Sequence, residues 1–156
     1  MGLAFNACEN IPTGTGGCPD SASTLAKIST SCIVPPYYPW KREPPAAYAF
    51  TYTRQCFCLA ESAGPFFVTQ HGDSVTQVLR RTEIGDTVAV TASLQSYALD
   101  SLWADVNQQL SKLYAHAFLR RDSTWGFPDS FYVDPYINLA DDENGLTITN
   151  FRDLTP

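Results

Sequence analysis

The run over residues 47–58 constrains the fold more than any other part of the sequence, because aromatic and small side chains alternate along it. Tyr48, Phe50 and Tyr52 occupy every second position, with alanine and threonine between them. Successive side chains of a β-strand point to opposite faces, so this period of two predicts a long strand with one aromatic face. Such a face is stable only when a second layer covers it.

A helix is expected to supply the covering layer. Over residues 96–117 apolar side chains recur at helical spacing and polar ones occupy the opposite side, which predicts one long amphipathic helix. Burying its apolar stripe against the aromatic strand would remove several large side chains from water, each contributing about 1.5 to 3 kcal/mol. The stripe consists of Leu99, Leu102, Trp103, Val106, Leu110, Leu113, Tyr114 and Ala117.

Further alternating segments are separated by turn-forming residues. They predict strands over residues 66–71, 74–79, 115–121, 130–134 and 146–151, and residues 86–92 fit either a strand or a loop. Strands on both sides of one helix favour the α+β class. We therefore predict a single antiparallel β-sheet with one long amphipathic helix packed on one face.

The first 45 residues differ in character from the rest of the chain. They hold Cys8, Cys18 and Cys32, and five of the eleven prolines lie within residues 35–45. Turn formers without an apolar period, followed by a proline-rich strap, cannot join a helix or a sheet interior. We therefore divide the chain into a cystine- and proline-rich N-terminal arm, residues 1–45, which is irregular and stapled by disulfides, and a single α+β domain, residues 46–156.

The cysteines indicate an oxidising compartment. Cys56 and Cys58 share one strand face, where their β-carbons would be about 6 to 7 Å apart, beyond the roughly 4 Å that a disulfide spans. We therefore expect them to bond separately to the disulfide candidates of the arm, Cys8, Cys18 and Cys32. A redox-active pair and a soft-metal site with a histidine remain alternatives. Disulfides are typical of extracytoplasmic proteins, so we expect secretion, the cell surface or an organellar lumen.

Charge and motifs exclude several functional classes. Ten basic and sixteen acidic residues give a net charge of −6, which disfavours nucleic acid and anionic membranes as partners. No window approaches the roughly 18 consecutive apolar residues of a transmembrane helix. The amino terminus lacks a signal-peptide pattern, so we expect that any export signal has been removed. The common nucleophile, zinc and nucleotide-binding motifs are absent from the sequence, so we expect neither an enzyme nor a cofactor.

An acidic loop is the candidate metal site. Residues 134–145 combine carboxylates with asparagines and a glycine, and calcium prefers several oxygen ligands on a flexible loop. The candidate ligands are Asp134, Asp141, Asp142 and Glu143. Their spacing does not match an EF-hand, and the same residue types are typical of a solvated loop between strands. A carboxylate pair for acid/base chemistry is a third interpretation.

Aromatic residues in the strap and in a later turn are the candidate partner-facing residues. Tyr37, Tyr38 and Trp40 lie in the proline-rich strap, and Trp125 and Phe127 flank a glycine in a turn. Exposed rings of this kind anchor protein interfaces. The alternative is that the strap lies over the open edge of the sheet and buries its own rings.

Several motifs together resemble a known family. They are YAFTYTRQCFC at residues 48–58, GPFFVT at 64–69 with Gly72 and Val75 after it, Leu102-Trp103, DSTWGFP at 122–128, YVD at 132–134 and ADDE at 140–143. This order resembles domain of unknown function 6174, a family made up mainly of exported bacterial proteins, over roughly residues 40–151. The resemblance implies a small exported domain with no established activity, ligand or catalytic residue. It also admits a bond between Cys56 and Cys58 in place of separate partners.

These observations predict a non-catalytic extracytoplasmic accessory or interaction domain, a subunit docked on a larger protein assembly. The absence of recognised catalytic motifs and the presence of the N-terminal arm both favour this hypothesis. The alternative is a calcium- or small-ligand-binding module that uses the acidic loop at residues 134–143.

Overall fold

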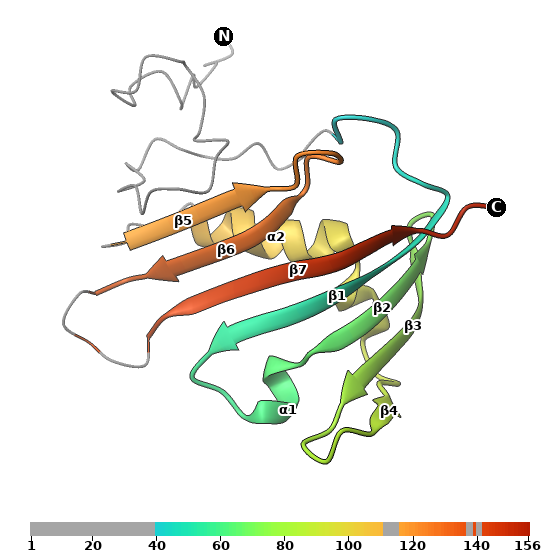
Figure 1. Cartoon of the computed structure of the whole chain (residues 1–156). Helices are drawn as coiled ribbons and strands as arrows, with labels where there is room; N and C mark the ends of the chain where they lie inside the picture. Colours follow the sequence, from blue (N-terminus) through green and yellow to red (C-terminus); the bar gives the residue numbers. More distant parts are fainter. Residues whose placement is uncertain (1–39, 111–115, 137–138, 140–141) are drawn as a thin grey trace, which may run out of the picture.

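A computed structural model describes residues 40–110, 116–136, 139 and 142–156 of the chain (Figure 1). The described part forms one sheet of seven strands, with three short helical segments between them. In chain order the elements are β1 (Ala47–Cys56), α1 (Ala60–Ala63), β2 (Phe66–His71), β3 (Ser74–Arg81), β4 (Thr87–Ala89), the 3₁₀ helix η1 (Leu94–Tyr97), α2 (Leu99–Leu110), β5 (His116–Arg121), β6 (Pro128–Asp134) and β7 (Asn144–Asp153).

The strand order across the sheet is β4-β3-β2-β1-β7-β6-β5, and every neighbouring pair is antiparallel. The first four strands form a meander that grows outward from β1. The last three form a second meander that returns β7 to the other side of β1. The connection through η1 and α2 lies between these halves in sequence, and α2 crosses behind the sheet (Figure 1).

The alternation in β1 decides which face of the sheet is covered. Tyr48, Phe50 and Tyr52 are buried, and they share the core with Trp103 and Val106 of α2. Because paired residues of antiparallel strands project to the same side, Phe50 and its partner Val68 both reach this core. The aromatic face and the helical stripe therefore meet. None of the helices in the described part is long and apolar enough to cross a membrane.

The predicted long amphipathic helix over residues 96–117 is wrong. Residues 94–97 form η1 instead, and the α-helix runs only from Leu99 to Leu110. At the other end Ala117 belongs to β5, where it alternates with buried Leu119 on a strand period. Ala117 of β5 lies by coincidence at a sequence position that fits the helical spacing of the apolar stripe. The proposed stripe members Leu113 and Tyr114 lie outside the described residues.

The predicted stapling of the N-terminal arm to the sheet is also wrong for Cys56 and Cys58. These two residues form a disulfide with each other, in the middle of the chain. The geometric argument against this pairing assumed an extended strand, but β1 ends at Cys56 and the next two residues form a bend. The bend brings the two Cα atoms to 5.2 Å, within the range of disulfide-bonded residues. Cys8, Cys18 and Cys32 lie outside the described residues.

Candidate functional site

An aromatic cluster fills one end of the core. Trp40 lies among five other rings, with centroid distances between 5.8 and 6.2 Å. Phe127 is 1% exposed, so the prediction that this ring faces a partner is wrong, because it packs under Trp40. Trp40 and Trp125 are partly buried against the same core. Tyr37 and Tyr38 lie outside the described residues. The five neighbours of Trp40 are Tyr48, Trp103, Trp125, Phe127 and Phe151.

A tight turn holds Trp125 in this cluster. One carboxylate oxygen of Asp122 accepts hydrogen bonds from the backbone N–H groups of Thr124 (2.9 Å) and Trp125 (2.6 Å). Gly126 has a φ of +90°, and a β-carbon there would lie 2.7 Å from Cγ of Lys41. The Lys41 N–H in turn donates to the carbonyl of Trp125 at 2.8 Å. These contacts make the turn a packing device that fastens the segment before β1.

The acidic loop gathers three of its predicted ligands around one tyrosine. Burial, and then the carboxylates of Glu143, Asp134 and Asp142, raise the pKa of Tyr132 on β6. Both carboxylate oxygens of Asp142 are buried without a hydrogen-bond partner among the described residues. No group of three or more metal-ligating side chains occurs within residues 40–110, 116–136, 139 and 142–156. Asp141 lies outside the described residues.

The end of the sheet opposite the aromatic cluster carries a hollow of about 640 Å³. Its walls come from α1 and the residue before it, and from the end of β3 with the turn that follows. Three apolar side chains at this end of the sheet have most of their surface exposed: Phe57 (78%), Leu59 (71%) and Ile84 (86%). Leu59 and Ile84 line the hollow, and Phe57 lies two residues before Leu59. We call this surface, Phe57, Leu59 and Ile84 with the hollow, the docking end.

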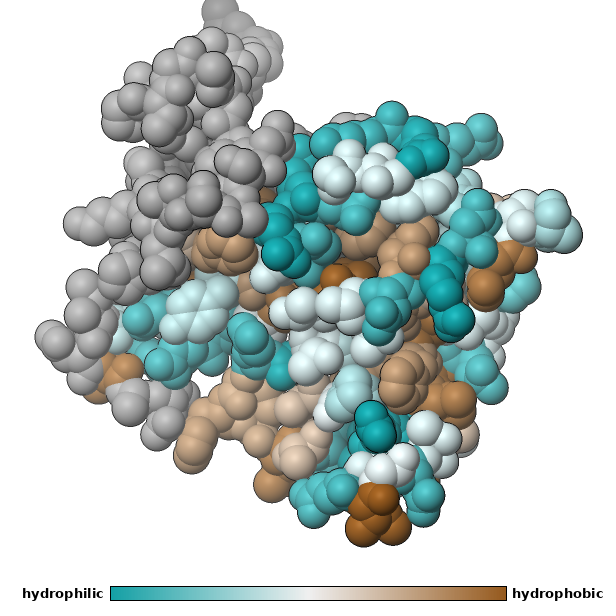
Figure 2. Space-filling model, viewed as in Figure 1, coloured by the Kyte–Doolittle hydropathy of each residue, from teal (hydrophilic) through white to brown (hydrophobic). Residues whose placement is uncertain are grey.

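Figure 2 shows hydrophobic residues at two places along the lower margin, near the end of β1 and at the β3–β4 turn, with hydrophilic residues between them. Large exposed side chains scattered singly are ordinary on protein surfaces, but a group at one end of the sheet is not. The disulfide encloses Phe57 between Cys56 and Cys58, so the backbone that presents this ring is cross-linked. The docking end therefore combines exposed apolar area with a constrained loop.

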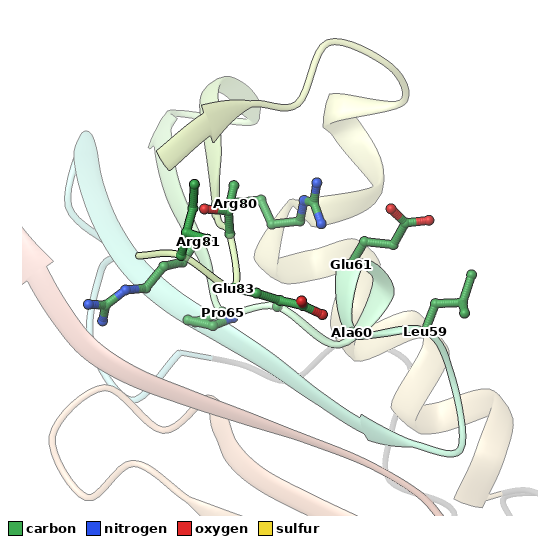
Figure 3. A pocket seen from close by; sticks show the side chains of 10 residues that line it. Leu59, Ala60, Glu61, Pro65, Arg80, Arg81 and Glu83 are labelled. Carbon is green, nitrogen blue, oxygen red and sulfur yellow. The ribbon is translucent and has the colours of Figure 1, made fainter. Parts of the chain in front are cut away.

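Charged residues of both signs rim the docking end (Figure 3). Arg80 pairs with Phe66 and so lies on the face of the sheet that α2 covers. Figure 3 shows Arg80, Glu61 and Glu83 extending to the same side of the hollow, while Arg81 points away. Neither Arg80 nor Glu61 forms an ion pair with another described residue. The rim thus offers both signs of charge to whatever covers the hollow.

Sequence reasoning missed the docking end, although one of its signals is visible. Ile84 stands alone among the turn formers of residues 82–86, where no packing role would be expected of an isoleucine. The alternating pattern places Phe57 in the predicted strand over residues 47–58, and this position does not predict an exposed ring. What the sequence could not show is that α1 and the β3–β4 turn line one hollow. β1 and β3 lie on either side of β2 and run in the same direction, so both strands end at the same end of the sheet.

Comparison with known proteins identifies one family. A model described as a family of unknown function, DUF6174, matches residues 37–153, which is most of the chain and includes every element described above. No curated protein and no solved structure matches the chain.

Proposed function

Since the chain belongs to DUF6174, a family of unknown function, we propose from its own surface that it is a non-catalytic extracytoplasmic interaction domain. In this proposal the chain is an accessory subunit that docks on a larger protein assembly. The docking end is the contact surface. The observation that carries the proposal is the exposure of Phe57, Leu59 and Ile84 at one end of the sheet. Each is more than two-thirds exposed, and Leu59 and Ile84 line one hollow.

The composition of the docking end suits a protein partner. The fully buried core of a protein interface is rich in apolar and aromatic residues, and its rim is polar and solvent-accessible. Here Leu59 and Ile84 line a hollow, and Arg80, Glu61 and Glu83 form a rim of mixed charge. The exposed ring of Phe57 lies two residues before Leu59. Opposite charges on the rim favour one orientation of the partner over others.

The Cys56–Cys58 disulfide supports both the docking role and the compartment. A ring that is already held in its bound position loses less conformational entropy when a partner covers it, so more of the contact energy remains as affinity. Disulfides persist in oxidising compartments and are rare in the cytosol. We therefore propose that the chain works in a secreted, cell-surface or organellar-lumen setting.

A photo-crosslinking experiment tests the proposal. The full chain carries a photoreactive amino acid at position 84 in one sample and at position 154 in the other, and both are expressed in the source cells. Leu154 is a matched control, because it is also an exposed aliphatic residue (43%) but lies beyond β7. We expect one discrete protein adduct from position 84 that position 154 does not give. Equal adducts from both positions, or none from position 84, would contradict the proposal.

The identified partner then allows a quantitative test. Truncating a central interface residue commonly costs 2 kcal/mol or more, which is about 30-fold in Kd. We expect Phe57→Ser and Ile84→Ser each to weaken binding by about that factor, and Leu154→Ser to leave it within about twofold. Because all three side chains are exposed, thermal unfolding should stay near that of the parent chain. If the parent chain and the three variants bound the partner with equal affinity, the docking end would not be part of the interface.

A calcium-binding module is the second candidate function, favoured by the two unpartnered carboxylate oxygens of Asp142. Calcium binding would have to draw Asp134 and Glu143 toward Asp142, because the described residues hold no group of three metal-ligating side chains. The fourth loop ligand that the sequence indicates is Asp141. Because a ligand that binds only the folded state raises stability by mass action, millimolar calcium should raise the melting temperature. The rise should disappear in Asp142→Asn. An unchanged melting temperature at millimolar calcium would exclude this candidate.

A further inference from the structure

A second hollow, distinct from the docking end, opens on the face of the sheet that α2 covers. It has a volume of about 420 Å³, within the range of small-molecule sites. Its lining comes from β1, α1, β2, η1 and α2, so five elements that are separate in sequence converge on it. We call it the Tyr52 cleft, after the strand residue at its centre.

The floor of the Tyr52 cleft is aromatic. Tyr52 stacks on Phe66 with ring centroids 5.7 Å apart, and Tyr97 of η1 meets Phe66 at 4.9 Å and Tyr52 at 6.2 Å. Tyr52 and Phe66 are buried and Tyr97 is partly buried. Three rings held against one another give an apolar surface that changes little on binding, which lowers the entropic cost of receiving a ligand.

The walls of the cleft carry one cation and one anion. Arg54 follows Tyr52 on the same face of β1, and Asp105 comes from α2 above that face. Both act electrostatically on the Tyr52 hydroxyl, so both lie near it, yet no ion pair within 4 Å joins them. Both are exposed, so they remain hydrated until a ligand arrives. A ligand with a carboxylate and an ammonium group would find a partner of opposite sign for each.

The Tyr52 hydroxyl adds a neutral hydrogen-bonding group between these charges. Burial raises the pKa of Tyr52, while the Arg54 guanidinium acts against this rise. The hydroxyl therefore keeps its proton at neutral pH and can donate a hydrogen bond as well as accept one. No other described residue forms a hydrogen bond with it. The hydroxyl opens to the cleft, so water can hydrogen-bond with it there and a ligand can take the place of that water.

We infer that the Tyr52 cleft binds a small zwitterion, a free amino acid with an apolar or aromatic side chain. Its carboxylate meets Arg54, its ammonium group meets Asp105, and its side chain lies on the floor of Tyr52, Phe66 and Tyr97. The site does not depend on the docking end, because the two hollows share no lining residue. The inference therefore goes beyond the proposed function and stands or falls separately from it.

Calorimetric titration of the full chain with three related probes tests this assignment. The probes are L-phenylalanine, its amide, which lacks the carboxylate, and N-acetyl-L-phenylalanine, which lacks the ammonium group. We expect the zwitterion to bind at least tenfold more tightly than either blocked compound. Arg54→Gln should abolish the preference over the amide, and Asp105→Asn should abolish the preference over the N-acetyl compound. Each variant should keep the other preference.

Control variants separate this test from folding and from the docking end. Arg152→Gln removes an exposed charge on β7, far from the cleft lining, and Ile84→Ser alters the docking end. Both should bind L-phenylalanine as the parent chain does. Three results would overturn the assignment. They are equal affinity for the three probes, no binding heat with any of them at about 10 mM, and binding of glucose in place of L-phenylalanine. Loss of binding in Ile84→Ser would show that the two surfaces are one site.

Discussion

Replacing Gln70 with leucine should destabilise the fold, because its side-chain amide is hydrogen-bonded at both ends inside the core. Gln70 is 2% exposed. Its Nε2 donates to the carbonyl of Gly72 at 2.9 Å, and its Oε1 accepts from the N–H of Leu99 at 3.2 Å. Leu99 is the first residue of α2, and the first N–H groups of a helix have no partner within it. One side chain thus ties the β2–β3 turn to the start of the helix.

The magnitude follows from what leucine leaves behind. The Leu99 N–H would be buried without a partner, which costs about 1 to 3 kcal/mol. Leucine would also remove the polar neighbour that the Gln70 amide provides for the Tyr48 hydroxyl. Water can hydrate the Gly72 carbonyl in its exposed turn, and the leucine side chain gains some apolar burial, so these two effects reduce the loss. We expect a net decrease of about 2 kcal/mol in the free energy of unfolding.

Urea titration of the full chain measures this decrease, with Gln77→Leu as the matched control. Gln77 lies on β3 with an exposed side chain, so its replacement should change stability by less than about 0.5 kcal/mol. The Gln70→Leu midpoint should fall while the slope stays constant, and the melting temperature should drop by about 6 °C. If Gln70→Leu matched the parent chain within about 0.5 kcal/mol, the buried amide would not be the link between turn and helix.

Three further changes test other parts of the fold. Gly145→Ala would place a β-carbon 2.6 Å from the carbonyl oxygen of Phe131, so we expect urea titration to show a loss of about 1 to 3 kcal/mol; no loss would mean that β6 and β7 lie farther apart. Burial raises the pKa of Tyr52, so the folded chain keeps a proton that the unfolded chain loses above pH 10; stability should fall there by up to about 1.4 kcal/mol per pH unit, and Tyr52→Phe should flatten the decline. Replacing Cys56 and Cys58 with serine opens a loop with a sequence separation of only 2, so stability should fall by no more than about 2 kcal/mol, whereas partner affinity should fall about tenfold. A loss of stability above about 2 kcal/mol with unchanged partner affinity would assign the disulfide a folding role instead.

Local alternation was enough to predict the strands but not the length of the helix. β2 spans Phe66–His71, the range that its pattern predicts, because every second side chain is buried. The predicted helix was too long because two periods overlap: Ala117 of β5 falls at a position that continues the apolar stripe of α2. No local signal marks the point at which the spacing changes from helix to strand.

The site was harder to predict than the fold, because its residues are unremarkable one by one. Gln70 looks like an ordinary turn-flanking residue, yet its burial depends on the helix that arrives 29 residues later. Arg54 and Asp105 come together only because α2 packs over β1. The Cys56–Cys58 bond depends on where the strand ends, a boundary that propensity fixes only to within a few residues.

The two ends of β1 have different roles: residues at its start stabilise the core, and residues at its end form the proposed binding surfaces. At its start, Trp40 and its neighbouring rings close the core, and the turn at Gly126 fastens them there. At its end, the chain leaves the sheet through a cross-linked bend and α1, so Tyr52 and Phe66 form the floor of an open cleft. Because β1 ends at Cys56, the side chains of Phe57 and Leu59 are exposed and can contact other molecules. Substitutions at the first end should therefore lower stability, and substitutions of exposed side chains at the second, such as Arg54 and Phe57, should change binding while the melting temperature stays near that of the parent chain.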